Sequence, residues 1–463
     1  MKHKCEISIV VPVYNVEAYL ERCLQSLVNQ TFKDIEILII NDCSPDDSQT
    51  IIDHYVKSYN GMVRCIVHKE NLGLGGARNT GIDNAYGKYI IFIDSDDYVE
   101  LDMCEKLRSV AIANDSDVVG CDYLVGKPGS YKERSDFPSQ VCGALDYDKR
   151  RLLISGLSTS AVAKLIKRDL LVNNNLYFPE HMKNEDLATV PLWWVYVNRF
   201  DMVQEPMYYY VQTENSITRT KNSTSYYEII SAALRVYDLF LERELDKEYE
   251  ECMINVILKG VGTEVNQLVN NVNKPEKDEI IRLRDCAKKH LRDYQNNEFF
   301  VTKYEPFVLD AVDLLMKSVD DFIKYLESDA ATKSTDYKRV YSFLNLKSMN
   351  MLEWLKDKGY KVAIWGAGAK GKSFLQEVDN SHKFVQWVID KNSDKWNTSL
   401  PTGHTIKGFK EIADDVDVIL VMNRFHFESI RREVKLFRPN IKLVNMDIYY
   451  MASENHKVEE FVD

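Results

Sequence analysis

Three acidic residues stand together where an apolar stretch ends in the first quarter of the chain. The segment IIFIDSDD, residues 90–97, closes with Asp94, Asp96 and Asp97. A strand that carries carboxylates out of a core to its C-terminal end supplies oxygen ligands, which suit Mg²⁺ or Mn²⁺ bridging to a diphosphate. An Asp-x-Asp pair is a weak signal by itself, because acidic turns are common on solvated surfaces. Its weight depends on the elements and polar residues that come before it.

Strand-like and helix-like stretches alternate through the first 120 residues. Alternation of this kind, with continuously apolar strands, predicts a parallel sheet covered by helices on both faces. Such a sheet binds its ligand at the carboxyl ends of the strands. The predicted strands are 7–13, 35–41, 63–68, 89–94 and 117–121, and the predicted helices are 18–29, 48–58, 75–85 and 101–113.

Polar residues follow the first two predicted strands. Pro12, Tyr14 and Asn15 end the first strand. A nucleotide base could stack on the Tyr14 ring, and backbone groups at such an edge can bond a pyrimidine; the alternative is a core tyrosine. Asp42 ends the second strand, where it is placed to accept from a base N–H or a ribose hydroxyl. The nearby Asp46 could simply cap the next helix.

A glycine-rich segment, NLGLGGARNTGI, spans residues 71–82. Asn71 opens it, Gly75 allows the backbone to approach a ligand closely, and Arg78 supplies a fork for phosphate near a helix start. The alternative is a flexible loop with a surface arginine. A base site, a ribose acid, a phosphate arginine and metal carboxylates thus occur in order, and together they outweigh the separate alternatives.

In order and spacing, the first domain resembles family 2 glycosyltransferases of the GT-A fold, on the motifs VPVYN, NDCSPDDS, NLGLGGARNTGI and IDSDD. The resemblance covers about the first 220 residues. It implies that Tyr14 and Asp42 surround the uracil of a UDP-sugar and that Asp94 and Asp96 form the family's DxD motif. Asp96 would be the direct ligand of Mn²⁺ or Mg²⁺, and Asp94, with Ser95 beside it, would lie nearer the ribose and sugar.

The segment LYFPEHMKNEDLAT, residues 176–189, resembles the family's acceptor side, where a Glu-Asp pair supplies the base. The resemblance therefore implies a base at Asp186, with Glu185 beside it, opposite the metal. An acceptor hydroxyl must lose its proton as it attacks the anomeric carbon. With a metal ion on the leaving diphosphate, an in-line displacement inverts the configuration. The alternative for Asp186 is an acid favoured by a helix dipole.

The segment YYYVQTENSITRT, residues 208–220, resembles the family's lid over the diphosphate, and Ser216 and Arg219 are its candidate contacts. The chain also departs from the family pattern. Val162-Ala163 stand where Trp-Asn is frequent, and Cys43 replaces a common glycine. Neither departure removes a catalytic acid.

The C-terminal part carries a second glycine motif, Gly366-x-Gly368-x-x-Gly371, between a predicted strand and a helix. Asp390 ends the next predicted strand about twenty residues on, as a dinucleotide fingerprint requires. A turn that serves only helix–strand packing, or an interaction surface, is the alternative. The segment resembles the small Rossmann-like modules appended to sugar-modifying bacterial enzymes.

Composition limits the classes of partner. The 463 residues carry a net charge of −12, which argues against nucleic acid as a partner. Nine cysteines without a CxxC pair indicate a reducing compartment and no disulfide framework. No segment approaches the roughly 20 apolar residues of a membrane span. We therefore expect a cytoplasmic protein.

These observations predict an α/β protein in four segments. A GT-A domain with a Rossmann-like mixed sheet occupies 1–220, a helical connector 221–359, a Rossmann-like α/β domain 360–450, and a poorly ordered acidic tail 451–463. The resemblance implies transfer from a UDP-sugar to a saccharide or lipid-linked glycan acceptor in bacterial surface polysaccharide synthesis. Association with the inner membrane face through the acceptor, and a homo-oligomer, stay open. So do an NAD(P)-binding oxidoreductase and a catalytically inactive glycan-binding scaffold.

Overall fold

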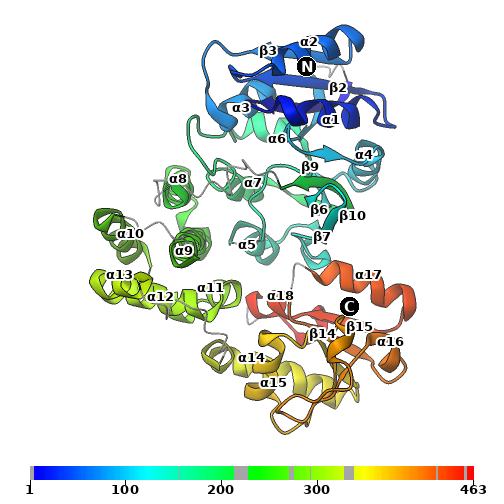
Figure 1. Cartoon of the computed structure of the whole chain (residues 1–463), viewed down its shortest axis with the longest axis vertical. Coiled ribbons are helices and arrows are strands. Elements are labelled where there is room, and N and C mark those ends of the chain that lie inside the picture. The colour runs from blue at the N-terminus through cyan, green and yellow to red at the C-terminus, as the bar shows by residue number, and fades with distance from the viewer. Residues whose placement is uncertain are drawn as a thin grey trace. The chain divides into compact units, whose positions relative to one another are not determined.

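The computed structural model describes residues 5–155, 157–212, 228–270, 276–291, 294–327, 338–423, 426–452 and 456–462. The chain divides into two compact units, which we call the N-terminal unit (Met1–Gly260) and the C-terminal unit (Val261–Asp463). The helices after residue 220 are shared between the units, because the first one and most of the second belong to the N-terminal unit (Figure 1). The predicted boundaries at 220 and 359 stay predictions.

The N-terminal unit is built on a ten-stranded mixed sheet, whose main path runs β3-β2-β1-β4-β9-β6-β10-β5. The first four strands of this path are parallel, as the alternation predicts. Strand β9 runs antiparallel to both of its neighbours, β4 and β6, and makes the sheet mixed. The strands are β1 (Cys5–Val13), β2 (Ile35–Asn41), β3 (Val63–Val67), β4 (Gly87–Phe92), β5 (Tyr98–Val99), β6 (Val118–Lys127), β7 (Ser130–Arg134), β8 (Gly143–Ala144), β9 (Lys164–Lys167) and β10 (Arg199–Val211).

Continuous burial explains the central strands. All seven residues of β2 are buried, as are the last seven of β1. Each fully buried Ile, Leu or Val side chain contributes about 1.5–3 kcal/mol, so these strands are fixed by burial on both faces. The helices of the unit are α1 (Glu17–Val28), α2 (Ser48–Ser58), α3 (Gly73–Asn84), α4 (Met103–Asn114), α5 (Tyr147–Ser155), α6 (Arg168–Asn173), α7 (Val190–Tyr196), α8 (Glu228–Glu242) and α9 (Asp246–Asn270, which extends into the C-terminal unit), with a 3-10 turn at Ser139–Val141.

The strand register brings the predicted polar residues to one edge of this sheet. Val13 of β1 lies opposite Asn41 of β2, and Asn41 lies opposite Val67 of β3. On the other side of β1, Phe92 of β4 pairs with Val10. The chain segments that leave these strands at their carboxyl ends are therefore neighbours.

The C-terminal unit holds a five-stranded parallel sheet with the order β13-β12-β11-β14-β15. This confirms the predicted small Rossmann-like α/β domain. Its strands are β11 (Val362–Trp365), β12 (Val385–Ile389), β13 (Ile406–Lys407), β14 (Val418–Val421) and β15 (Lys442–Asn445). Its helices are α10 (Lys277–His290), α11 (Glu298–Lys303), α12 (Pro306–Lys317), α13 (Val319–Glu327), α14 (Lys338–Asp357), α15 (Ala369–Val378), α16 (Phe409–Ile412), α17 (Phe427–Phe437) and α18 (Met446–Met451), with 3-10 turns at Tyr294–Asn296, Ser393–Lys395 and Val458–Phe461.

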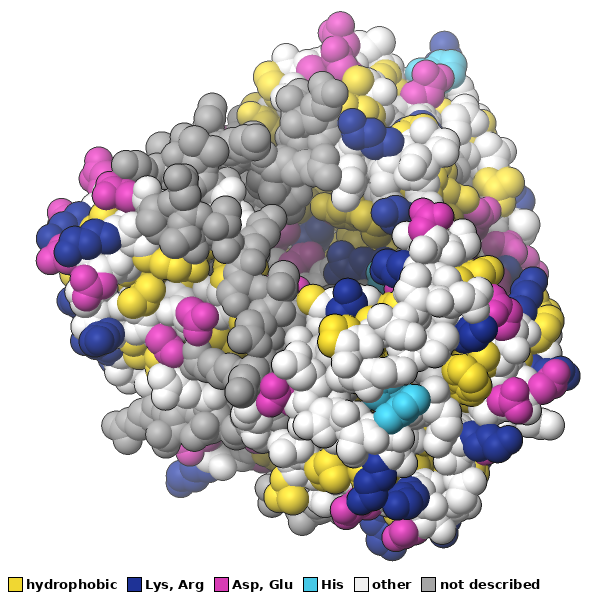
Figure 2. Space-filling view, turned by 60° about the horizontal axis from the view of Figure 1, so that its bottom comes forward, with side chains coloured by type: hydrophobic (Ala, Val, Ile, Leu, Met, Phe, Trp, Pro, Cys, Tyr) yellow, Lys and Arg dark blue, Asp and Glu magenta, His cyan; other side chains and the backbone are white. Residues whose placement is uncertain are grey.

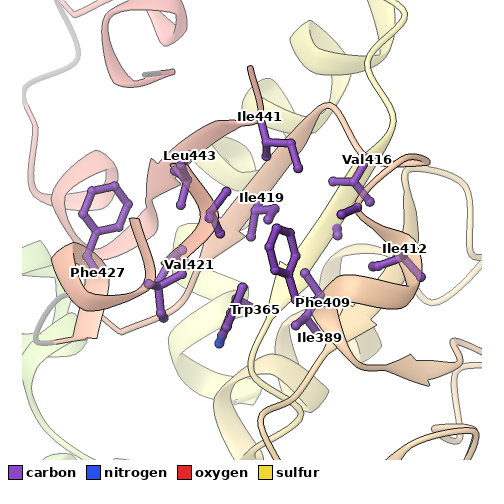
Figure 3. Close-up of a cluster of buried hydrophobic side chains, with 14 residues drawn as sticks. Trp365, Ile389, Phe409, Ile412, Val416, Ile419, Val421, Phe427, Ile441 and Leu443 are labelled. Atoms are coloured by element: carbon purple, nitrogen blue, oxygen red, sulfur yellow. The ribbon is translucent and has the colours of Figure 1, made fainter. Parts of the chain in front are cut away.

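One face of this second sheet carries an apolar core. Figure 3 shows Val421 of β14 and Leu443 of β15 gathered with Phe427 of α17, and Trp365 lying near Phe409. The expectation of a poorly ordered tail is wrong for residues 456–462. They include a 3-10 turn because Phe461 is buried and its ring contacts that of Tyr449 at 5.3 Å between centroids.

The surface of the chain mixes charges of both signs. On the face in Figure 2, acidic and basic side chains are interspersed. None of the nine cysteines, which all lie within the described residues, forms a disulfide bond. Within the described ranges, we find no helix whose length and apolar character would let it cross a bilayer.

Candidate active site

The end of β1 presents an exposed aromatic ring. Tyr14 is 50% exposed, so it is not a core tyrosine. Asn15 next to it has a left-handed backbone (φ 55°), and its N–H donates to Ser44 Oγ at 2.8 Å. Asp46 accepts from the backbone N–H of Glu17 at 2.8 Å, which ties the turn after β2 to the start of α1. The Tyr14 ring is thus exposed at the carboxyl end of β1, next to a turn that these bonds fix.

Asp42, at the end of β2, is buried and organises the turn that follows β3. Its Oδ1 accepts from His68 Nδ1 at 2.6 Å and from the Leu72 N–H at 2.8 Å. The Asn71 amide donates to the backbone oxygen of Asp42 at 3.1 Å. Two of the predicted donor-binding residues, Asp42 and Asn71, therefore hold each other and the start of the glycine-rich segment.

The three acids after β4 have different environments. Asp97 is 1% exposed, and its carboxylate accepts from the Tyr208 hydroxyl and the Val211 N–H, both at 2.8 Å. Asp94 and Asp96 are only partly buried. Burial, and next the charge of Asp94, raises the pKa of Asp96 to about 6. Asp97 thus anchors the turn to β10, while the negative charges of Asp94 and Asp96 oppose each other.

The carboxylates of Asp94 and Asp96 suit a divalent cation that is bound together with substrate phosphates. Among the described residues, no three His, Cys, Asp or Glu side chains are grouped so that they could hold a metal ion by themselves. Mg²⁺ is usually held by one or two carboxylates together with substrate phosphates rather than by an all-protein cage. Asp94 and Asp96 fit that mode, because their mutual repulsion is relieved by a cation.

Arg78 joins the DxD turn to the Glu-Asp pair. It lies in α3, and its side chain is 1% exposed. Nη2 donates to Asp94 Oδ1 at 3.0 Å, and Nη1 donates to Glu185 Oε1 at 2.7 Å and Asp186 Oδ1 at 2.5 Å. The acids of two motifs about 90 residues apart thus meet on one guanidinium. Sequence reasoning assigned Arg78 to phosphate, and that contact stays a prediction.

The surroundings of Asp186 differ from those of a simple helix-start acid. Its Oδ2 accepts from the Ala161 N–H at 2.9 Å, while Oδ1 is on Arg78. Burial raises the pKa of Asp186, and Arg78 opposes that rise. Burial, and then the charge of Asp186, raises the pKa of Glu185 to about 7. The charges of the two neighbouring acids therefore oppose each other, and Arg78 offsets this repulsion.

Lys164 is a site residue that sequence reasoning noted only as a neighbour of a family departure. It is 1% exposed, and Nζ donates to the backbone oxygens of Ser160 at 2.7 Å and Val162 at 3.3 Å. These two carbonyls flank Ala161, the residue that donates to Asp186. Burial lowers the pKa of Lys164 to about 8. A lysine inside an otherwise apolar run, AVAKLI, is the signal that could have marked it.

The glycines of residues 71–82 pack closely against the protein. A Cβ on Gly75 would lie 2.1 Å from the backbone oxygen of Pro179. The Asn79 amide donates to Phe178 O at 2.8 Å, and its Oδ1 accepts from Phe178 N–H at 2.9 Å. Helix α3 is therefore seated on the chain that leads to Glu185. The predicted lid residues Ser216 and Arg219 lie outside the described residues.

In the C-terminal unit, the last glycine of the second motif is packed against its own chain. A Cβ on Gly371 would lie 2.1 Å from Gly366 O, and Gly366 has φ 121°. Asp390 Oδ2 accepts from the Ala367 N–H at 3.1 Å and from Lys395 Nζ at 2.8 Å. The contacts of Gly371 and Asp390 fit the packing alternative, whereas a Cβ on Gly366 or Gly368 would meet no atom within 4 Å, so nucleotide binding by Gly366, Gly368 and Gly371 stays a prediction.

The mixed sheet and the polar edge at the ends of β1, β2 and β4 define a GT-A domain, and comparison with known proteins agrees. Residues 8–170 match the family described as "Glycosyl transferase family 2", and residues 324–443 match one described as "C-methyltransferase C-terminal domain". Residues 8–170 of the N-terminal unit are therefore similar to the family 2 glycosyltransferase domain.

Two curated relatives illustrate the similarity. The chain is 36% identical over 226 residues to EpsJ of Bacillus subtilis, named as an uncharacterized glycosyltransferase, which is 46% of this chain and 62% of EpsJ. It is 36% identical over 180 residues to the poly(ribitol-phosphate) beta-glucosyltransferase of Bacillus spizizenii, covering 38% of this chain and 27% of that enzyme. The chain thus spans less than two thirds of the length of both relatives.

The fold also matches a solved structure. The crystal structure of S. aureus TarS in complex with UDP-GlcNAc has a TM-score of 0.54 and 21% sequence identity, and covers 71% of this chain and 92% of that chain. At this identity the likeness shows the fold alone, and it agrees with the GT-A architecture of the N-terminal unit.

Proposed function

We propose that the chain transfers a sugar from a nucleotide-sugar donor, a UDP-sugar, to a glycan acceptor with inversion at the anomeric carbon. One observation carries the proposal: Asp94 of the DxD pair and the Glu185-Asp186 pair share the buried guanidinium of Arg78. A site that holds a leaving diphosphate and a site that holds a base must be adjacent for an in-line displacement. The strand edge brings these two sets of acids together.

On the donor side, the uracil stacks on the exposed ring of Tyr14. Pro12 and Asn15 supply backbone groups beside it, and the turn held by Asp42 and Asn71 closes the other side. Gly75 and Ser95 are also predicted donor-site residues, with Gly75 acting through its close packing on Pro179, and Ser216 and Arg219 are the predicted lid contacts. Asp96, with Asp94, would hold Mn²⁺ or Mg²⁺. Such an ion, when bound, neutralises charge on the departing diphosphate.

On the acceptor side, Asp186 takes the proton of the attacking hydroxyl. Only the ionised carboxylate can accept it. Arg78 and the Ala161 N–H both favour the ionised form and orient both oxygens. Glu185, with its pKa near 7, is the neighbour to which that proton can pass. Inversion follows because attack and departure take place on opposite faces of the sugar.

The acceptor is a saccharide or lipid-linked glycan of a bacterial surface polymer. The names of relatives support this class, since one is a poly(ribitol-phosphate) beta-glucosyltransferase and another a minor teichoic acid biosynthesis protein. A lipid-linked acceptor would bring the protein to the inner face of the membrane.

The test is UDP release from a panel of UDP-sugars, with Mn²⁺ or with EDTA. We expect wild type to hydrolyse or transfer one donor only with metal, and Asp96→Ala to lose this activity. The control is Asp34→Asn, because Asp34 is exposed at the amino end of β2, away from the site. UDP binding without turnover with any acceptor would favour a glycan-binding scaffold. No UDP binding by calorimetry would contradict the donor site, and NADH binding would then be measured.

A further inference from the structure

Arg78 is enclosed on every side by this unit's own groups. Both terminal nitrogens donate to carboxylates, and Nε is buried as well. The guanidinium carbon lies 5.3 Å from the ring centroid of Phe178 and 5.9 Å from that of Phe92. No edge of the guanidinium faces solvent.

The backbone around Arg78 is fixed to the same segment that leads to the base. Gly75 leaves no room for a side chain against Pro179, and Asn79 bonds both backbone groups of Phe178. Gly75 therefore allows helix α3 to pack closely against residues 178–179. A glycine-rich turn that cradles a ligand would instead leave its glycines open.

The charges around Arg78 also argue against a contact between Arg78 and the diphosphate. Asp94, Glu185 and Asp186 are three carboxylates with one cation between them. Removing one partner of a buried ion pair leaves an uncompensated charge, which is strongly unfavourable. A diphosphate that recruited Arg78 would have to leave these acids facing one another without it.

We propose, on the basis of the proposed function, that Arg78 is a positioning residue. It holds the base Asp186 at a fixed place relative to the metal-side acid Asp94, and it does not contact the donor's diphosphate. The shared guanidinium sets the spacing between the two halves of the site. The glycine-rich segment serves to place that guanidinium.

The experiment compares Arg78→Lys and Arg78→Met with wild type. Lysine keeps the charge but lacks the planar fork that reaches three carboxylates. We expect kcat to fall by about 100-fold, as for a misplaced reacting group, while the affinities for UDP and for uridine both change by less than about threefold. If Arg78 contacted the diphosphate, its loss would instead weaken the affinity for UDP by roughly 10–100-fold and leave the affinity for uridine unchanged. That second pattern would overturn the proposal.

Matched controls separate positioning from folding. Arg64→Lys alters another arginine–carboxylate pair, between Arg64 of β3 and Glu36 of β2 at 2.7 Å, and should leave kcat within about twofold because neither residue of this pair contacts the proposed site residues. Circular dichroism verifies that each variant is folded. If both Arg78 variants unfold, Asn79→Ala takes their place, since it keeps Arg78 but releases Phe178 from α3.

For Asn79→Ala we expect roughly a tenfold loss of kcat with unchanged affinity for UDP and uridine, by the same misplacement argument. An unchanged kcat in that variant would contradict the coupling through α3. If wild type releases no UDP from any donor, the proposed function fails. The ratio of UDP to uridine affinity in Arg78→Met still decides whether Arg78 contacts the diphosphate.

Discussion

The Tyr208 hydroxyl is expected to hold the DxD turn in place. It accepts from the Asp94 N–H at 3.2 Å and donates to Asp97 Oδ2 at 2.8 Å. Tyr208 is fully buried in β10, and Asp97 is 1% exposed. The substitution Tyr208→Phe removes the oxygen and keeps the ring. It leaves a buried carboxylate and a backbone N–H each short of one partner.

The magnitude follows from these two bonds. Each buried group left without its partner costs about 1–3 kcal/mol, so we expect the free energy of unfolding to fall by roughly 3 kcal/mol. A domain is stable by about 5–15 kcal/mol, so the variant should still fold. The turn that carries Asp94 and Asp96 should loosen, and the Mn²⁺ concentration for half-maximal activity should rise by about 10-fold, as when the support of a metal ligand is removed.

The assay pairs urea unfolding with Mn²⁺ titration of UDP release. Tyr209→Phe is the matched control, because Tyr209 is the next residue on β10 and its hydroxyl also donates to an acid, Glu100. Tyr209 is only half-buried, and losing its bond should cost about 1 kcal/mol without changing the metal requirement. Equal behaviour of the two variants in both measurements would refute this account of Tyr208.

Three further predictions concern pH, packing and the C-terminal turn. The pKa of Glu185 is raised from 4.5 to about 7, so between these pH values the folded state binds more protons than the unfolded state. The free energy of unfolding should therefore fall by on the order of 2 kcal/mol as the pH rises from 4.5 to 7. In urea unfolding, Glu185→Gln should show a smaller fall over the same pH range. Gly75→Ala should lower the melting temperature strongly or prevent folding, because Cβ would lie 2.1 Å from Pro179 O, whereas Gly368→Ala, with no atom within 4 Å, should change it little. Asp390→Asn should destabilise the C-terminal unit by about 1–3 kcal/mol in urea unfolding, since its carboxylate bonds the turn; a normal stability would contradict the packing account.

The sequence pattern predicts the helices and strands that are determined by residues close together in the chain. β2 spans 35–41 and α2 spans 48–58, as the apolar run and the helical spacing predict. Strand β9 has four residues and inserts antiparallel between β4 and β6 from far along the chain. Nothing in four residues encodes that partner. The mixed character of the sheet therefore came from the family resemblance and not from the alternation.

The same difference between local pattern and long-range contacts applies to the site residues. Residue type and position after a strand were enough to select Asp94 and Asp96, but not to separate them from Asp97. That separation depends on the hydroxyl of Tyr208, which lies more than 100 residues away in sequence. Arg78 was selected for its charge, and its partners on residues 185 and 186 are equally remote. Contacts of this separation leave no periodic signal.

Five carboxylates belong to the DxD turn and the Glu-Asp pair, and their partners in the structure differ. The Asp97 carboxylate accepts hydrogen bonds from a hydroxyl and a backbone N–H. The carboxylates of Glu185 and Asp186 both accept from Arg78. Asp94 shares that same arginine through one oxygen only. Asp96 keeps a pKa raised to about 6 by burial and by Asp94. Because Arg78 is already divided among three acids, the divalent ion that we propose to enter with the donor's diphosphate would balance the charge at Asp94 and Asp96.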